Sequence, residues 1–156
     1  MTEEAVKQTK VIVFQLKDEE YAIPVENVGS IERLLPITRV PKTAEFVEGV
    51  INLRGVVTPI IDLRKRFNLE ASEHDEQTRI IVSSIADMDV GLIVDSANDV
   101  LDLKEDDIEP PPEVVGTVEV EYIRGVAKLE RRLLILLDLE MVLNQKEVQK
   151  LMEIEG

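Results

Sequence analysis

The chain has 156 residues and a formal net charge of −14, and 44% of its residues are hydrophobic although only 3% are aromatic. This charge argues against nucleic acid as a main partner, because phosphate binding requires a concentrated basic surface. A sequence without cysteine excludes disulfides, thiolate catalysis and cysteine-rich zinc sites.

The N-terminal segment MTEEAVKQTK is polar and includes acids, so it is not a signal peptide. No apolar run approaches the roughly 20 residues that a membrane span requires, so direct membrane insertion is not expected. We therefore expect a soluble, cytoplasmic protein.

The first half of the chain predicts a mainly β structure after a flexible leader at residues 1–9. Runs rich in valine and isoleucine alternate with polar turns, as is typical of half-buried strands. Residues 36–47 contain Pro36 and Pro41 and predict a loop along the surface. Strands are expected at residues 11–16, 21–25, 50–51 and 56–61.

Residues 48–66, EGVINLRGVVTPIIDLRKR, predict a hairpin followed by a short helix. The turn carries Arg54 at its tip, and Gly55 can adopt the positive φ that a short hairpin loop with a bulge requires. The second strand stops at Asp62, a favourable N-cap for a helical turn over residues 63–67.

The second half repeats this β pattern after a polar linker at residues 70–77. Residues 104–108 predict one helical turn, which the prolines at 110–112 end. Asp138 is expected to cap a final amphipathic helix at about residues 138–153. Strands are expected at residues 79–83, 90–94, 100–103, 122–129 and 133–137, with turns at 87–89 and 95–99.

A duplicated β unit is the simplest explanation of an internal alignment in the sequence. Residues 46–68 align without a gap with residues 122–144, and residues 21–31 align with 90–100 in the same order. Glycines and aspartates recur at equivalent positions of the first alignment: Gly49 with Gly125, and Asp62 with Asp138. The alignment predicts one domain, residues 1–156, made of two subdomains at about residues 10–69 and 78–144.

The two hairpin tips differ in sequence, so the fold does not require the first tip, and that tip is a candidate for function. The first has Asn52, Arg54 and Gly55 where the second has Lys128, Glu130 and Arg131. Arg54 could be a solvent-exposed charge, or its planar guanidinium could bind a partner's carboxylate or carbonyl groups. A seam between the two halves, lined by aliphatic residues, would suit an amphipathic helix of another protein.

Support for catalysis is weak. His74, the single histidine, lies in the acidic linker and is expected to be solvated. Asp62 and Asp138 could form a pair of catalytic carboxylates, but helix capping explains their recurrence more simply. The sequence contains no phosphate-binding glycine motif and no calcium loop. We expect no metal and no cofactor, with metabolite binding by a small β-barrel as an alternative.

Four segments carry a resemblance to a known family: EEYAI at 19–23, TRVP at 38–41, FVEGVINLRGVVTPIIDLR at 46–64 and IVD at 93–95. Together with LLILLD in the last hairpin, they are similar to the CheW family of chemotaxis coupling proteins, over about residues 10–150. The resemblance implies two SH3-like β-barrels around a shared hydrophobic core, with short helices and a C-terminal helix. It also implies a non-catalytic adaptor that ties the cytoplasmic tips of methyl-accepting chemoreceptors to the histidine kinase CheA in membrane-associated arrays.

The resemblance further implies two binding surfaces. A receptor helical hairpin is expected near Val28, Ser30 and Ile31, with coupling also involving Gly49, Val50, Asn52 and Arg54. Contacts with the regulatory domain of the kinase are expected around Ile37, Val40 and Phe46 and, for ring contacts, around Glu109 and Val114. Some relatives are expected to have a basic residue and an aromatic residue at these last two positions, where this chain has Glu109 and Val114. Ring contacts at this surface are therefore in question.

The same coupling module also occurs fused to a phosphorylatable receiver domain, or as the regulatory domain of the kinase. A stand-alone adaptor is favoured here, because the chain closes with a terminal helix and carries no receiver-like extension. We expect it in the cytoplasm, recruited to chemoreceptor arrays.

Overall fold

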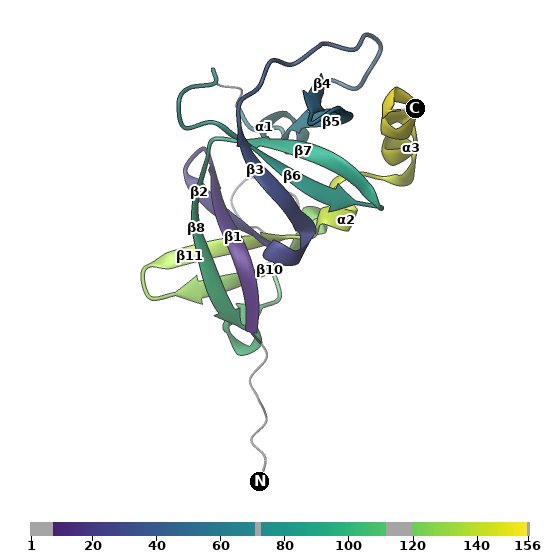
Figure 1. Cartoon of the computed structure of the whole chain (residues 1–156). Coiled ribbons are helices and arrows are strands. Elements are labelled where there is room, and N and C mark those ends of the chain that lie inside the picture. Colours follow the sequence, from purple (N-terminus) through teal and green to yellow (C-terminus); the bar gives the residue numbers. More distant parts are fainter. Residues whose placement is uncertain (1–7, 71–72, 112–119, 156) are drawn as a thin grey trace.

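The computed structural model describes residues 8–70, 73–111 and 120–155 (Figure 1). The first half forms β1 (Gln8–Leu16), β2 (Glu19–Pro24), η1 (Val25–Asn27), β3 (Val28–Arg33), β4 (Val47–Leu53), β5 (Val56–Asp62) and α1 (Leu63–Arg66). The second half forms β6 (Arg79–Ile85), β7 (Met88–Val94), β8 (Ser96–Lys104), η2 (Glu105–Asp107), β9 (Ile108–Glu109), η3 (Val120–Tyr122), β10 (Ile123–Leu129) and β11 (Arg132–Leu137). It ends in α2 (Leu139–Val142) and α3 (Gln145–Glu155).

The strands form two sheets, and each sheet combines strands of both halves. A six-stranded sheet has the order β8-β1-β2-β11-β10-β9, and a five-stranded sheet has the order β3-β6-β7-β5-β4. The hairpin β1–β2 therefore lies among strands of the second half, and the hairpin β6–β7 lies among strands of the first half. The prediction of a mainly β fold is confirmed, and the architecture is consistent with two SH3-like subdomains. The boundaries at residues 10–69 and 78–144 stay a prediction.

The internal repeat is visible in equivalent backbone features. Gly49 and Gly125 both follow a register shift in their hairpins. The side chain of Asp62 accepts a hydrogen bond from Arg64 N at 2.9 Å, and that of Asp138 accepts one from Glu140 N at 3.1 Å. Both aspartates thus cap a short helix, as the repeat predicted.

The main core lies between the two sheets, as expected for a shared core. A row of aromatic rings runs through it: Phe14 and Tyr21 lie 5.8 Å apart between centroids, Tyr21 and Phe67 6.3 Å, and Phe67 and Tyr122 5.2 Å. Successive residues of a strand point to opposite faces. Accordingly Ile12 faces this core, whereas Val11 and Val13 belong to a separate cluster within the six-stranded sheet. The five-stranded sheet encloses a similar cluster around Ile51.

Some sequence predictions were wrong in detail. The leader predicted at residues 1–9 is too long, because Gln8 and Thr9 already belong to β1, where they pair with Lys104 and Leu103 of β8. The polar segment 95–99 was predicted as a turn, but β8 already begins at Ser96, because it pairs with β1 through a register shift beside Val13. The turn predicted at 87–89 lies at Ala86 and Asp87, which both adopt a positive φ, and Met88 starts β7.

The predicted single helix at 138–153 is two helices. Asp138 caps the short α2, and Asn144 starts α3 with a reciprocal cap. Asn144 Oδ1 accepts from Glu147 N at 2.8 Å, and a Glu147 carboxylate oxygen accepts from Asn144 N at 2.8 Å. This capping box gives α3 its own start and separates it from α2.

Arginine–carboxylate pairs connect elements that are distant in sequence. Arg64 of α1 binds both carboxylate oxygens of Asp95, which also accepts from Lys17 N at 2.8 Å. Arg132 of β11 binds Glu20 of β2 at 2.8 Å. Burial disfavours the ionised form of Asp95, but the hydrogen bonds from Arg64 and Lys17 and the charge of Arg64 outweigh it and hold the pKa of this carboxyl below its usual range.

We predict that Asp95→Asn lowers the free energy of unfolding at pH 7 by about 1.5 to 3 kcal/mol, the range for hydrogen bonds to charged groups. Because the folded-state pKa of Asp95 is depressed, its contribution is present above the unfolded pKa of about 3.9 and is lost as the pH falls through the folded value. The free energies of unfolding of the unchanged protein and of Asp95→Asn should therefore approach each other as the pH falls. Urea unfolding of both between pH 7 and pH 3 measures this. The control is Asp102→Asn, which changes an exposed carboxylate of β8. A deficit of Asp95→Asn that persists unchanged at acidic pH would contradict the assignment.

Candidate functional site

The tip of the β4–β5 hairpin is a tight two-residue loop. Leu53 pairs with Val56, so Arg54 and Gly55 form the loop, with φ of 53° and 85°. Two consecutive positive φ values are typical of a type I′ turn, which matches the right-handed twist of the strands. Asn52 Oδ1 accepts a hydrogen bond from Gly55 N at 2.8 Å and closes the turn. The positive φ of Gly55 is confirmed, but the bulge lies at the other end of the hairpin, beside Gly49.

Arg54 connects this tip to strand β3. Its guanidinium donates to Glu32 Oε2 at 3.2 Å, while the Arg54 side chain remains 72% exposed. Such an exposed pair contributes little to stability. The contact shows that the hairpin tip lies next to the strand that carries Val28, Ser30 and Ile31.

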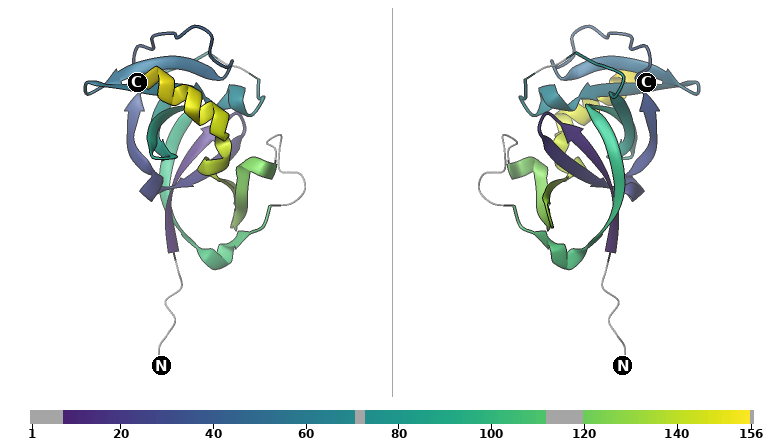
Figure 2. Two further views of the ribbon diagram at one scale, coloured as in Figure 1. Left: turned by 90° about the vertical axis from the view of Figure 1, so that its right-hand side faces the viewer. Right: turned by 90° about the vertical axis from the view of Figure 1, so that its left-hand side faces the viewer.

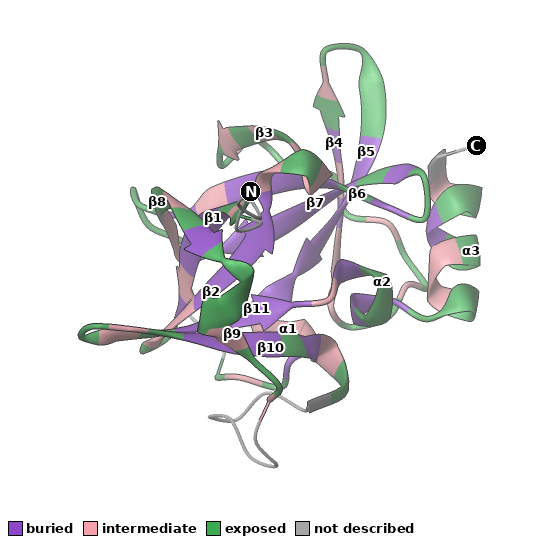
Figure 3. Cartoon of the chain, turned by 90° about the horizontal axis from the view of Figure 1, so that it is seen from below, coloured by how far each residue is buried: buried purple, intermediate pink, exposed green. Residues whose placement is uncertain are grey.

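Large apolar side chains are exposed on the same two elements, and sequence reasoning missed most of them. Val56 is 56% exposed and Val57 44%, in a strand that was predicted to be half-buried. Ile31 is 40% exposed on β3, and Leu34 follows at 37%. Figure 3 shows the exposed tip extending beyond the buried part of the hairpin. The sequence feature that could have indicated the exposure of Val56 and Val57 is their position directly after the turn, where neighbouring strands no longer cover either face.

The predicted receptor residues differ in accessibility. Val28 and Ser30 are half-buried on β3, where Val28 packs against the main core. Val50 is half-buried and exchanges backbone hydrogen bonds with Thr38, at 2.8 and 2.9 Å. Gly49 is buried in β4 and is therefore not accessible to a partner. Ile31, Asn52 and Arg54 are exposed.

The predicted kinase residues do not form one surface. Ile37 is half-buried and packs on the cluster around Ile51. Val40 and Phe46 lie together along a groove beside α3. Glu109 lies in β9 of the other sheet, with a carboxylate oxygen 3.8 Å from Lys128 Nζ. Val114 lies outside the described residues.

A polar pocket of about 200 Å³ contains Asp62, His74 and Asp95. Burial raises the pKa of Asp62, and the hydrogen bond from Arg64 N opposes this shift. Asp62 and Asp138 cap different helices, so the capping interpretation is confirmed. Within the described residues, histidine, aspartate and glutamate form no group of three that could hold a metal ion.

Comparison with known proteins identifies the family. Residues 10–147 match the family model of the CheW-like domain. The chain is 47% identical to the chemotaxis protein CheW of Bacillus subtilis (strain 168), over 96% of this chain and 96% of the relative. It is 41% identical to the chemotaxis protein CheW of Klebsiella aerogenes, over 88% of this chain and 82% of the relative. The crystal structure of the scaffolding protein TtCheW from Thermoanaerobacter tengcongensis matches with a TM-score of 0.84 and 35% identity, over 90% of this chain and 96% of that one.

Together with the fold, these likenesses put the chain among scaffolding proteins, a class that acts by binding rather than by catalysis. The chain belongs to the CheW family and is an adaptor protein of chemotaxis. In the part of the chain that the structure describes, no helix combines the length and the apolar character needed to cross a membrane.

We predict that Gly49→Ala destabilises the fold by about 2 to 4 kcal/mol, through backbone strain and overpacking. Gly49 has a φ of 143°, and a Cβ there would lie 2.1 Å from the carbonyl oxygen of Thr38. The control is Gly29→Ala on β3, where the nearest atom to an added Cβ is Val82 O at 3.6 Å. Thermal unfolding compares the two variants. Equal stability of both would contradict the strain argument.

Proposed function

We propose that this adaptor couples the cytoplasmic tips of chemoreceptors to the histidine kinase CheA in membrane-associated arrays. Family membership supports the proposal, because the relatives at 47% and 41% identity are chemotaxis proteins over most of their length. The observation that carries it is the exposed β4–β5 tip, where Arg54, Val56 and Val57 face solvent although folding does not require them there.

The receptor surface in this proposal consists of the β4–β5 tip and β3. A helical hairpin presents apolar side chains in rows along its length, and exposed Ile31, Val56 and Val57 supply apolar partners. In the described residues Arg54 makes one hydrogen bond, to Glu32, although a guanidinium has five N–H donors. Donors therefore remain for carboxylate or carbonyl groups of a receptor, and we propose that Arg54 contacts it directly. Val28, Ser30 and Val50 support this surface from half-buried positions, and Gly49 and Asn52 shape the hairpin.

The kinase contacts in this proposal use residues other than those of the β4–β5 tip and β3, and they lie at two separate places. Val40 and Phe46 are candidates on the loop after β3, with Ile37 supporting that loop from the core. Glu109 and Val114 belong to the segment proposed for ring contacts. Separate surfaces allow receptor and kinase to bind at the same time, which an adaptor requires.

Coupling then follows from linkage rather than chemistry. An adaptor bound to both partners holds them at a high effective concentration. A signal passes only when the receptor state changes the preferred geometry of the bound kinase. The chain makes and breaks no covalent bond in this scheme.

We predict that Arg54→Ala folds normally but lowers receptor-dependent kinase stimulation by about tenfold, the effect of losing one interface anchor. The measurement is kinase autophosphorylation with receptor fragment and purified adaptor, beside an unfolding curve. The internal repeat offers a matched control, Arg131→Ala, which removes an exposed arginine from the equivalent β10–β11 tip. Unchanged stimulation by folded Arg54→Ala would remove Arg54 from the site.

A second variant separates direct contact from positioning. Glu32→Gln removes the negative charge that Arg54 contacts and leaves the arginine in place. Direct receptor contact predicts that Glu32→Gln keeps stimulation. A loss equal to that of Arg54→Ala would show instead that the ion pair only positions the hairpin.

A further inference from the structure

A groove separates α3 from the loop at residues 40–47, and we call it the α3 groove. It has a volume of about 620 Å³. Apolar side chains contribute to both of its walls, with Val40, Ala44, Phe46 and Val47 on the loop side and Leu151 and Ile154 on the helix side. Figure 2 shows α3 lying across the outside of the strands, close to the end of the chain.

The walls of the α3 groove are already fixed. On the loop side, Thr43 Oγ1 donates to Val40 O at 3.0 Å, and Val47 N donates to Ala44 O at 3.0 Å. Between the walls, Arg66 lies over the Phe46 ring at 4.7 Å and binds Glu147 of α3 at 3.0 Å. A preformed groove loses little conformational entropy when it is filled.

The α3 groove is also elongated. Lys146, Lys150 and Ile154 follow one another at intervals of four residues, so they form a line along one side of α3. The 11 residues of α3 give this wall a length of about 16 Å, at 1.5 Å per residue. An elongated groove with apolar side chains on both walls fits a helix better than a compact ligand.

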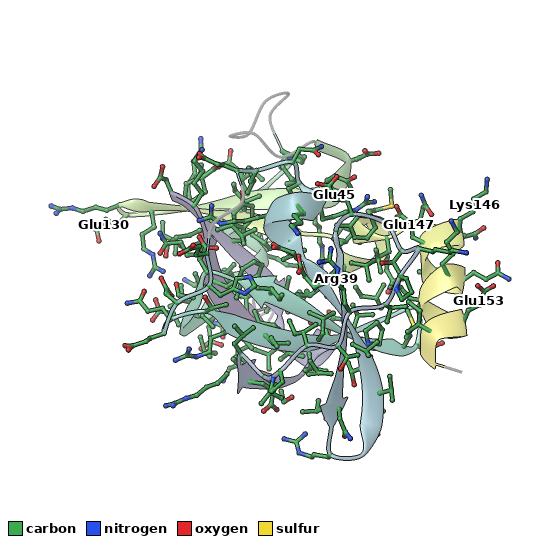
Figure 4. The ribbon with its side chains drawn as sticks, turned by 90° about the horizontal axis from the view of Figure 1, so that it is seen from above. Arg39, Glu45, Glu130, Lys146, Glu147 and Glu153 are labelled. Atoms are coloured by element: carbon green, nitrogen blue, oxygen red, sulfur yellow. The ribbon has the colours of Figure 1, made fainter. Side chains whose placement is uncertain are left out.

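The charge around the α3 groove is opposite to that of the whole chain. The net charge of the chain is −14, yet Lys42, Lys146 and Lys150 border the groove. None of these lysines forms an ion pair with another described residue. Glu147 is already bound to Arg66, which leaves Glu153 as the remaining acid of the lining. In Figure 4 the loop that carries Arg39 and Glu45 lies beside α3, and Lys146 and Glu153 extend from the helix.

We propose that the α3 groove docks an acidic amphipathic helix of a partner protein. Its apolar side chains would fill the space beside Phe46 and Ile154, and its carboxylates would pair with the three lysines. The proposal goes beyond coupling because it specifies the partner's chemistry. It shares Val40 and Phe46 with the proposed kinase surface but does not require the partner to be the kinase.

The test uses the ¹⁵N-labelled protein of 156 residues and a designed helical peptide of about 18 residues, with leucine on one face and glutamate beside it. The comparison peptide carries lysine at every glutamate position. We expect the acidic peptide to shift the amide signals of Ala44, Phe46, Lys150 and Ile154. Equal binding of the lysine peptide, shifts confined to other residues, or no binding at millimolar concentration would each overturn the proposal.

Charge variants test the role of the lysines. The double variant Lys42→Glu/Lys150→Glu is expected to weaken binding of the acidic peptide about tenfold. The reason is that two attractive exposed charge pairs become repulsive. Lys10→Glu/Lys104→Glu makes the same change in net charge on the six-stranded sheet and is expected to bind normally. Equal weakening by both variants would overturn the proposal, because it would indicate a long-range effect of net charge.

Other occupants give different results. Concentration-dependent dimerisation that Lys42→Glu/Lys150→Glu abolishes would assign the groove to a second copy. Stronger binding to anionic phosphatidylglycerol vesicles than to the acidic peptide would assign it to a membrane. Each outcome would overturn the proposal. Receptor-dependent kinase stimulation, measured on the same variants, reports separately on the coupling function.

Discussion

The exchange of hairpins between the two halves is the constraint on which the fold depends. It rests on two parallel strand pairs, β5 with β7 and β2 with β11. In the first pair, Ile60 lies opposite Gly91, where an added Cβ would lie 2.4 Å from Ile60 Cδ1. In the second pair the equivalent partners are Leu136 and Ala22. Small residues thus allow close packing at both junctions, and neither sheet is complete without the other half.

This shared construction leaves the surface free to diverge. The two halves keep the bulge glycines and the capping aspartates, because these positions determine the backbone. The hairpin tips are not constrained in this way, so one carries Arg54 and the other Glu130 and Arg131. Near-symmetric architecture with asymmetric tips suits an adaptor, which must present different surfaces to different partners.

Local patterns predicted much of the fold but not its long-range pairing. The repeat, the tight turn at Gly55 and the caps at Asp62 and Asp138 could be predicted because each depends on neighbouring residues. The extension of β8 from Ser96 depends on β1, about 80 residues away in sequence, and no local preference indicates it. The exposure of Val56 and Val57 likewise depends on where the neighbouring strands end. For the candidate site, the sequence proposed Arg54, which stays a prediction, and it indicated neither the exposure of these valines nor the α3 groove.

The hairpin exchange also determines how the chain folds while it is being made. Glu20 of β2 and Arg132 of β11 meet in the folded protein although they are 112 residues apart in sequence. A ribosome adding 5 to 20 residues per second needs about 5 to 20 seconds to cover that distance. Until β8 and then β11 have been made, the β1–β2 hairpin lacks its neighbours in the sheet, and an isolated hairpin is marginally stable in water. The six-stranded sheet therefore closes only after β11 has been made, and termination before β11 would release unpaired strand edges that are prone to aggregation.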